Sequence, residues 1–99
     1  MPKLTTIYWR DIPAQVIGQQ GRTRHKTQLD PRFAEAIDRA AMRAGKGSSK
    51  AYLEEWRRES RPCSGDVAEQ VRQEVERLQT DFPADLLEAT VKNGGRKPL

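Results

Sequence analysis

The stretch "TIYWRDIPAQVIGQQGRTRHKTQL", residues 6–29, decides the fold, because it combines strand-forming residues with signals for chain reversal. β-branched and aromatic side chains gather at its start and favour a pleated, half-buried strand. Pro13 lacks the N–H that a sheet ladder needs, so the first strand should end there. Gly18 and Gly21 supply backbone freedom for a reversal. We therefore predict an N-terminal antiparallel sheet of two to three strands, at residues 4–12, 14–19 and 22–29.

The remaining sequence has the apolar spacing of helices. Asp30 and Pro31 are typical of a helix start, and Gly45 suits the left-handed position that ends one. "SSKAYLEEWRRESRP" predicts a second helix, capped by Ser48 or Ser49 and continuing to the residue before Pro62. Two further helices are predicted before and after the break at residues 81–83. Strands followed by helices indicate an α+β fold, with about four helices packed on one face of the sheet.

Length and composition fit one domain, which we place at residues 1–92, followed by a flexible tail at 93–99. A single cysteine, Cys63, excludes an internal disulfide and fits a reducing compartment. The sequence has no signal-like apolar run and no stretch long enough to span a membrane. We expect a cytoplasmic protein without membrane contact.

Charge is distributed unevenly along the chain. Residues 1–61 contain 13 Lys and Arg against 7 Asp and Glu, whereas residues 62–99 contain 5 against 7. A basic front half favours an anionic partner, such as an acidic protein surface or nucleic acid. An ordinary soluble surface is the alternative, because the net charge is only +4.

Three segments together resemble a known family: "IYWRDIPAQV" at 7–16, "FAEAIDRAAMRAG" at 33–45 and "YLEEWRR" at 52–58. They are similar to the small bacterial "virulence factor" domain, over about residues 3–92. That name describes a phenotype, so the resemblance implies no catalytic residues. It implies at most an accessory role beside methyltransferase or other one-carbon enzymes. Larger relatives that join a similar domain to helical repeats imply an interaction module.

The titratable residues do not form a recognisable catalytic pattern. His25 and Cys63 are the single histidine and the single cysteine, and they fall in a predicted strand and a predicted loop. A Cys–His pair would need them adjacent in space, and a zinc site would need more nitrogen and sulfur ligands. A reactive thiol at Cys63, favoured by nearby arginines, remains an alternative. We predict no cofactor and no metal, and a protein that acts without catalysis.

The best functional candidate is the basic third strand. Arg22, Arg24 and Lys26 alternate and should project from one face of the sheet. If Arg10 on a neighbouring strand shares that face, with Tyr8 nearby, a basic patch results. Such a patch could bind an acidic protein or, alternatively, nucleic acid or a phosphate ligand. The alternative is that these cations protect an edge strand from pairing with other chains, which requires no binding partner.

Aromatic residues beside arginine give a second candidate surface. Trp56 and Arg57 form one such pair, and residue types of this kind are enriched at interaction hot spots. Packing in the core is the alternative for each tryptophan. We therefore predict a non-catalytic accessory or protein-interaction domain with a basic sheet surface, leaving homodimer formation open.

Overall fold

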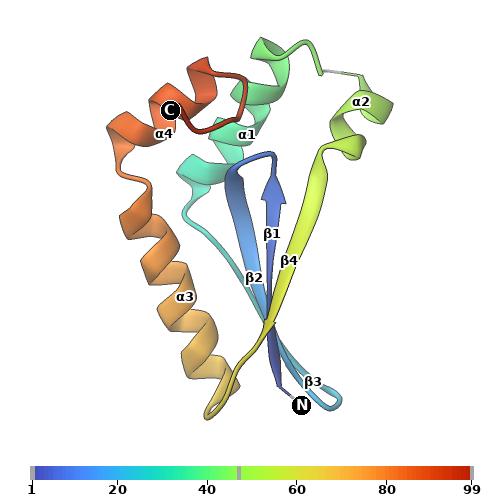
Figure 1. The fold of residues 1–99 in the computed structure, drawn as a ribbon, viewed down its shortest axis with the longest axis vertical. Coiled ribbons are helices and arrows are strands. Elements are labelled where there is room, and N and C mark those ends of the chain that lie inside the picture. The colour runs from blue at the N-terminus through green and yellow to red at the C-terminus, as the bar shows by residue number, and fades with distance from the viewer. Residues whose placement is uncertain (1, 47, 99) are drawn as a thin grey trace.

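The computed structural model describes residues 2–46 and 48–98 and has an α+β fold (Figure 1). Three strands come first along the chain, a fourth strand lies between helices, and two helices end the fold. The elements in chain order are β1 (Lys3–Trp9), β2 (Ile12–Gln20), β3 (Thr23–Gln28), α1 (Pro31–Arg43), α2 (Ser49–Glu54), β4 (Trp56–Pro62), α3 (Val67–Asp81) and α4 (Ala84–Lys92).

The four strands form one antiparallel sheet in the order β3-β2-β1-β4. The first reversal comes earlier than predicted: β1 ends at Trp9, and Arg10 turns the chain with a φ of 53°. Pro13 therefore lies inside β2. It pairs with Tyr8 at a register shift between β1 and β2. Proline is tolerated at such an irregularity, because the regular hydrogen-bond pattern is interrupted there and does not require its missing N–H. The second reversal, at Gly21 with a φ of 59°, lies where it was predicted. Gly18, which was predicted to take part in this reversal, instead lies inside β2 and pairs with His25.

The fourth strand is the main correction to the prediction. The predicted second helix is only six residues long in the structure, α2, and β4 follows immediately. Ser48 caps α2 by accepting a hydrogen bond from the Ala51 N–H, as predicted. The following residues have good helix propensity, but β1 offers a free edge to them. All seven residues of β1 pair with β4, from Lys3 with Pro62 to Trp9 with Trp56, and this pairing overrides the local preference.

The other helices agree with the prediction. Helix α1 starts with Pro31 at its first position and is followed by Gly45 in a left-handed conformation, with a φ of 73°. Asp66 caps α3 through its carboxylate, which accepts the Ala68 N–H. Phe82 and Pro83 separate α3 from α4.

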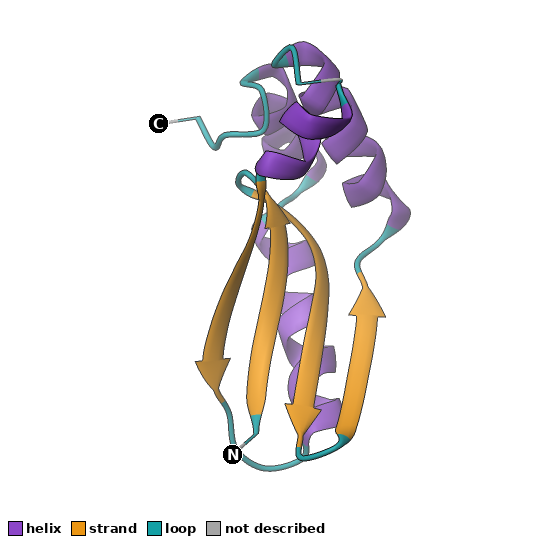
Figure 2. Ribbon diagram, turned by 90° about the vertical axis from the view of Figure 1, so that its right-hand side faces the viewer, coloured by secondary structure: helices purple, strands orange, loops and turns teal. Residues whose placement is uncertain are grey.

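Figure 2 shows the sheet from the side away from α3, with α3 behind it and the other helices gathered at its upper end. Gly18 of β2 allows α3 to lie close. A Cβ at this position would be 2.5 Å from Cγ1 of Val67 and 2.6 Å from Cγ2 of Val71. Side chains alternate along strands, so every second residue of each strand faces α3 and the others face away.

The C-terminal residues pack on the β1–β2 turn. The Asp11 N–H donates to the Gly95 carbonyl at 2.9 Å, and the Lys97 N–H donates to Oδ2 of Asp11 at 2.7 Å. Gly95 lies against Trp9, which is completely buried. The segment that we predicted to be a flexible tail thus contacts the rest of the domain as far as Lys97.

Candidate interaction surface

One face of the sheet is not covered by α3, and we call it the open face. Strand register identifies its residues, because paired residues share a face and Gly18 faces α3. Below the helices at its upper end, the open face consists of Lys3, Thr5, Ile7, Gln15, Ile17, Gln19, Arg24, Lys26, Gln28, Arg58, Ser60 and Pro62.

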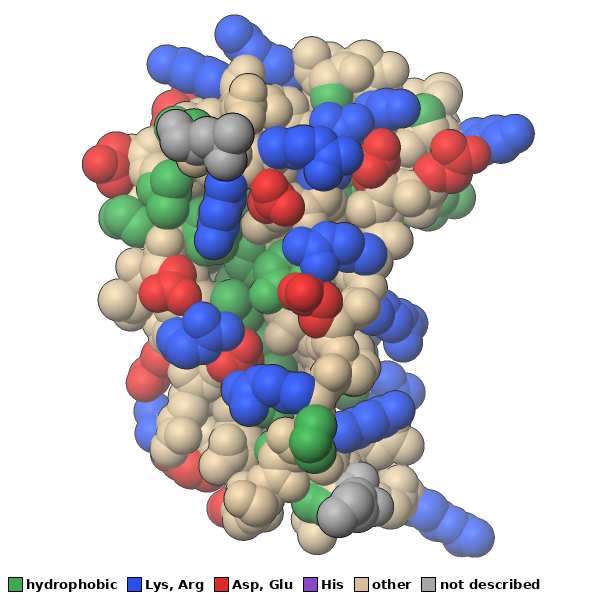
Figure 3. Space-filling view, viewed as in Figure 1, with side chains coloured by type: hydrophobic (Ala, Val, Ile, Leu, Met, Phe, Trp, Pro, Cys, Tyr) green, Lys and Arg blue, Asp and Glu red, His purple; other side chains and the backbone are tan. Residues whose placement is uncertain are grey.

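The charges on the open face are all positive. Its four charged residues are exposed, and none takes part in the ion pairs found among the described residues: Lys3, Arg24, Lys26 and Arg58. Figure 3 shows Lys and Arg side chains projecting from the side of the molecule away from α3. Polar and apolar side chains lie between them, and the central Thr5 and Ile17 are only 7% and 6% exposed. The open face is therefore a broad cationic surface with a closely packed centre.

Three of the predicted binding residues lie in this region. Arg24 and Lys26 are on the open face, as the alternation of β3 predicted, and Arg22 is exposed in the β2–β3 turn. Lys3 and Arg58 were missed. Arg58 could not be assigned to the sheet because its segment was predicted to be a helix. Lys3 could have been found, because it alternates with Thr5 along the first strand and so shares a face with it.

Arg10 does not join this surface, and the expectation that it shares a face with Arg24 and Lys26 is wrong. It lies in the β1–β2 turn, and its side chain is only 14% exposed. Its guanidinium donates to the Gly94 carbonyl at 3.0 Å and to Oε1 of Glu55 at 3.2 Å. This contact, chiefly the hydrogen bond from Arg10, lowers the pKa of Glu55. The geometry indicates that Arg10 holds the turn to the C-terminal residues and to α2.

Tyr8 and Arg57 lie on the opposite side of the sheet from the open face. The guanidinium of Arg57 stacks over the Tyr8 ring, 4.4 Å from its centre, and donates to the Arg10 carbonyl at 2.9 Å. Both residues therefore face the region between β4 and α3. Trp56, the other predicted binding residue, is on the same side as the open face but at its upper, partly covered end.

A groove, which we call the anchor groove, adjoins the upper end of the open face. It has a volume of about 370 Å³ and lies between β2, β3, α1 and the aromatic residues of α2 and β4. Seven of its ten lining residues are apolar or aromatic: Ala14, Leu29, Pro31, Ala34, Ile37, Tyr52 and Trp56. The polar members are Gln15, Gln28 and Asp38. Gln15 and Gln28 belong to both surfaces, so the groove and the open face are continuous.

Aromatic contacts hold one wall of the anchor groove in place. The Tyr52 ring stacks on Trp9 at 5.9 Å and meets Trp56 edge-on at 5.7 Å. The indole N–H of Trp9 donates to the Tyr52 carbonyl at 2.9 Å. Burial, and secondarily the charge of Asp38, raises the pKa of the Tyr52 phenol, which therefore stays a neutral hydroxyl at physiological pH. Tyr52 and Trp56 each remain half-buried and present part of their surface to the groove.

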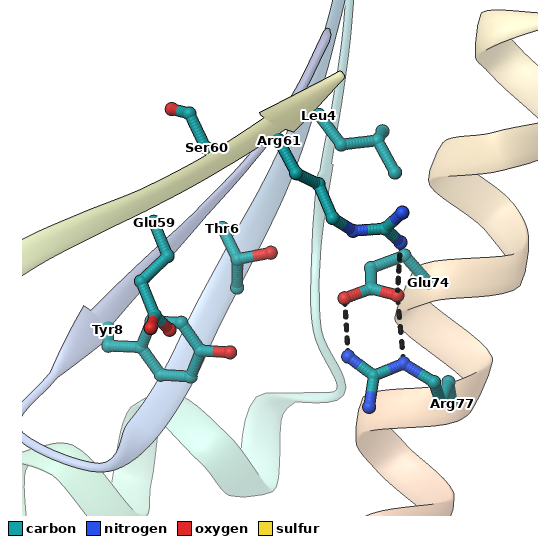
Figure 4. A pocket seen from close by; sticks show the side chains of 8 residues that line it. All are labelled: Leu4, Thr6, Tyr8, Glu59, Ser60, Arg61, Glu74 and Arg77. Carbon is teal, nitrogen blue, oxygen red and sulfur yellow. Dashed lines mark hydrogen bonds and ion pairs between the residues drawn. The ribbon is translucent and has the colours of Figure 1, made fainter. Parts of the chain in front are cut away.

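A second hollow lies on the other side of the sheet, between α3 and strands β1 and β4 (Figure 4). Its most buried charge is Glu74 of α3, which is 6% exposed. Arg77 donates to both oxygens of this carboxylate, at 2.9 and 2.6 Å, and Arg61 reaches it from β4 at 3.2 Å. The hydrogen bond from Arg77 is the main cause of the lowered pKa of Glu74. An adjoining hollow shares Tyr8, Glu59 and Arg77 with it and adds Arg57 and Asp81. We call the two hollows together the paired-charge cleft.

The remaining polar groups of the paired-charge cleft also interact mainly with each other. Arg57 pairs with Glu59 at 3.1 Å, and Arg77 pairs with Asp81 at 2.9 Å. The hydroxyls of Thr6 and Tyr8 point toward α3 in Figure 4. Burial, followed by the charges of Glu59 and Glu74, raises the pKa of Tyr8. Because cations and carboxylates here neutralise one another, the cleft attracts a charged ligand less than the open face does.

His25 and Cys63 are not brought together by any described contact. His25 is exposed on β3 opposite Gly18, and the half-buried Cys63 follows β4, where its N–H donates to the Pro2 carbonyl. In the described part of the chain, no three His, Cys, Asp or Glu side chains gather where a metal ion would bind. None of its helices is both long and apolar enough to cross a bilayer.

Comparison with protein families confirms the resemblance noted in the sequence. Residues 7–91 match the family model described as "Virulence factor", and this match covers most of the chain. The chain therefore belongs to the virulence factor family. Comparison with curated proteins and with solved structures gives no match.

Proposed function

We propose that this domain is a non-catalytic interaction module that binds an acidic protein partner through its open face. The observation that carries the proposal is the charge pattern of that face. Its four cations have no carboxylate beside them on the face, whereas the arginines of the paired-charge cleft are neutralised within the domain. Unpaired cations on one side of a protein attract and orient an acidic surface.

Two alternatives use the same surface and have less support. Binding of single-stranded nucleic acid usually combines cations with exposed aromatic rings on which bases stack. The open face has no aromatic residue below the anchor groove. Homodimer formation through two open faces would bring like charges together, which is unfavourable. Binding of an acidic protein needs no aromatic rings for stacking, and it brings carboxylates rather than further cations to the open face.

The test compares two charge-reversed variants with the same change in net charge. Arg24→Glu/Lys26→Glu changes the open face, whereas Lys50→Glu/Lys92→Glu changes exposed residues on α2 and α4. The probe is a fluorescent peptide of alternating Glu and Ser, with a Gln and Ser peptide as the neutral control. We expect the open-face variant to lose about tenfold in affinity, because two modest surface attractions become repulsions. The control variant should bind like the wild type.

Duplex and single-stranded DNA of matched length serve as competing probes at the same salt concentration. Tighter binding of DNA than of the acidic peptide, lost in the same variant, would replace the protein partner with nucleic acid. Equal binding of the peptide by wild type and open-face variant would refute the surface assignment. The family resemblance implies a place beside one-carbon enzymes, so methyltransferases are the first natural partners to test by co-purification with and without nuclease.

A further inference from the structure

We infer that the anchor groove receives a large apolar side chain of the same partner segment, so that the ligand is an acidic extended peptide with an apolar anchor. This inference rests on the proposed function. It adds the chemistry of the partner: an apolar or aromatic residue for the groove, with carboxylates at alternate positions for the open face.

The first argument is the composition of the anchor groove. Seven of the ten residues that line it are apolar or aromatic, and half-buried Tyr52 and Trp56 form one wall. Tyrosine and tryptophan in partly enclosed positions are the residue types that dominate binding energy at protein interfaces. A volume of about 370 Å³ accommodates one large side chain and part of its backbone.

The second argument is an unsatisfied polar atom in the wall of the groove. Oε1 of Gln15 is shielded from solvent and has no hydrogen-bond partner among the described residues. A buried acceptor without a donor is costly, and a donor supplied by a ligand recovers that cost. A backbone N–H of an extended peptide, reached by a small rotation of the amide, is such a donor.

The third argument is the geometry that joins the groove to the open face. Gln15 pairs with Gln28 beside the groove, Ile17 pairs with Lys26 in the next row, and Gln19 pairs with Arg24 in the row after that. Same-face residues of a strand are roughly 7 Å apart, and the same spacing applies to an extended ligand. An apolar residue in the groove therefore places every second ligand residue opposite successive rows of the open face, where the cations lie.

The test uses two acidic peptides that differ at one position. Both carry Glu at alternate positions with Ser between them, and the central residue is Phe in one and Ala in the other. We expect the Phe peptide to bind roughly tenfold or more tightly, because it buries a large apolar side chain in the groove and the Ala peptide does not. A central anchor with Glu on both sides makes the result independent of the direction in which the peptide binds.

A variant of the groove shows where the anchor binds. Ala34 is an exposed residue of α1 that lines the groove, and Ala34→Gln extends a neutral side chain into it. Ala68→Gln, at an exposed position on α3, is the matched control. The Ala34→Gln variant should lose the advantage of the Phe peptide and keep the affinity for the Ala peptide. The indole N–H signal of Trp56 in NMR spectra should shift with the Phe peptide and not with the Ala peptide.

Each outcome separates the inference from the proposed function. Equal affinity for the two peptides would overturn the anchor and leave the acidic partner in place. Tight binding of a Phe peptide whose Glu residues are replaced by Gln would instead contradict the acidic partner. Self-association of the domain that Ala34→Gln abolishes would make a second copy the occupant of the groove and overturn the inference.

Discussion

Replacing Gly18 tests the face assignment on which both proposals depend. In the structure α3 lies so close to this glycine that the Cβ of Gly18→Ala would be 2.5 Å from Val67 and 2.6 Å from Val71. Relieving such overlaps in a packed interior costs roughly 1–3 kcal/mol. Alanine in a strand recovers roughly 0.5–1 kcal/mol of backbone entropy relative to glycine. The net loss from these two terms is about 0–2.5 kcal/mol. Because two separate overlaps are shorter than 3.0 Å, we expect Gly18→Ala to lower the free energy of unfolding by about 1–2 kcal/mol, in the upper part of that range.

Thermal and urea unfolding, followed by circular dichroism, measure this loss. For a domain of this length it corresponds to a fall in Tm of roughly 4–16 °C. The decisive control is a double-mutant cycle with Val67→Ala, which removes the nearer methyl group. If α3 covers Gly18, the double variant loses less stability than the two single variants together. A Gly18→Ala variant as stable as the wild type, with additive effects in the cycle, would refute the packing of α3 on this face.

Two further predictions concern the C-terminal contact and the buried carboxylate. Gly95→Ala should destabilise the fold by about 2–4 kcal/mol, because its Cβ would lie 2.8 Å from Cζ3 of Trp9 and its φ is +96°. The control is Gly21→Ala, which is also at positive φ but has nothing within 4 Å and should lose only about 1 kcal/mol of stability. Equal losses in the two variants would mean that Trp9 does not constrain residue 95. The pKa of Glu74 is lower in the folded state than its usual value of 4.5, so its stabilisation is present above that pH and is lost as the pH falls through the folded pKa. Stability measured at pH 7 and below pH 4 should therefore fall less in Glu74→Gln than in the wild type, and parallel pH profiles would contradict this.

Most elements could be predicted because their signals are local. Pro31 before an apolar stripe and Gly45 as the stop lie in or directly after the helix that they define, and both agree with the structure. The early reversal at Arg10 was missed because a left-handed turn at arginine has no local signature. It is held by contacts from Glu55 and Gly94, far away in the sequence.

The fourth strand shows why part of the site could not be predicted. Residues 56–62 contain no local strand signal strong enough to oppose their helix propensity, and their conformation is fixed by pairing with β1. Both Arg57 and Arg58 were therefore predicted to be helical, whereas in the structure Arg58 lies on the open face and Arg57 lies in the paired-charge cleft. Arg24 and Lys26, by contrast, were placed correctly because strand alternation is a property of their own segment.

The central position of β1 has a consequence for how the chain reaches its native state during synthesis. Its partners on the two sides become available at very different times: β2 follows at once, whereas the Thr5–Ser60 hydrogen bond joins residues 55 positions apart. Until β4 leaves the ribosome, one edge of β1 has no partner, and exposed edges of this kind favour association between nascent chains. The last stage waits longer still, because the Lys97–Asp11 contact spans 86 positions and needs nearly the whole chain. Pairing of β4 with β1 and of the C-terminal residues with the β1–β2 turn is therefore a late, long-range event, and contacts of this kind slow folding.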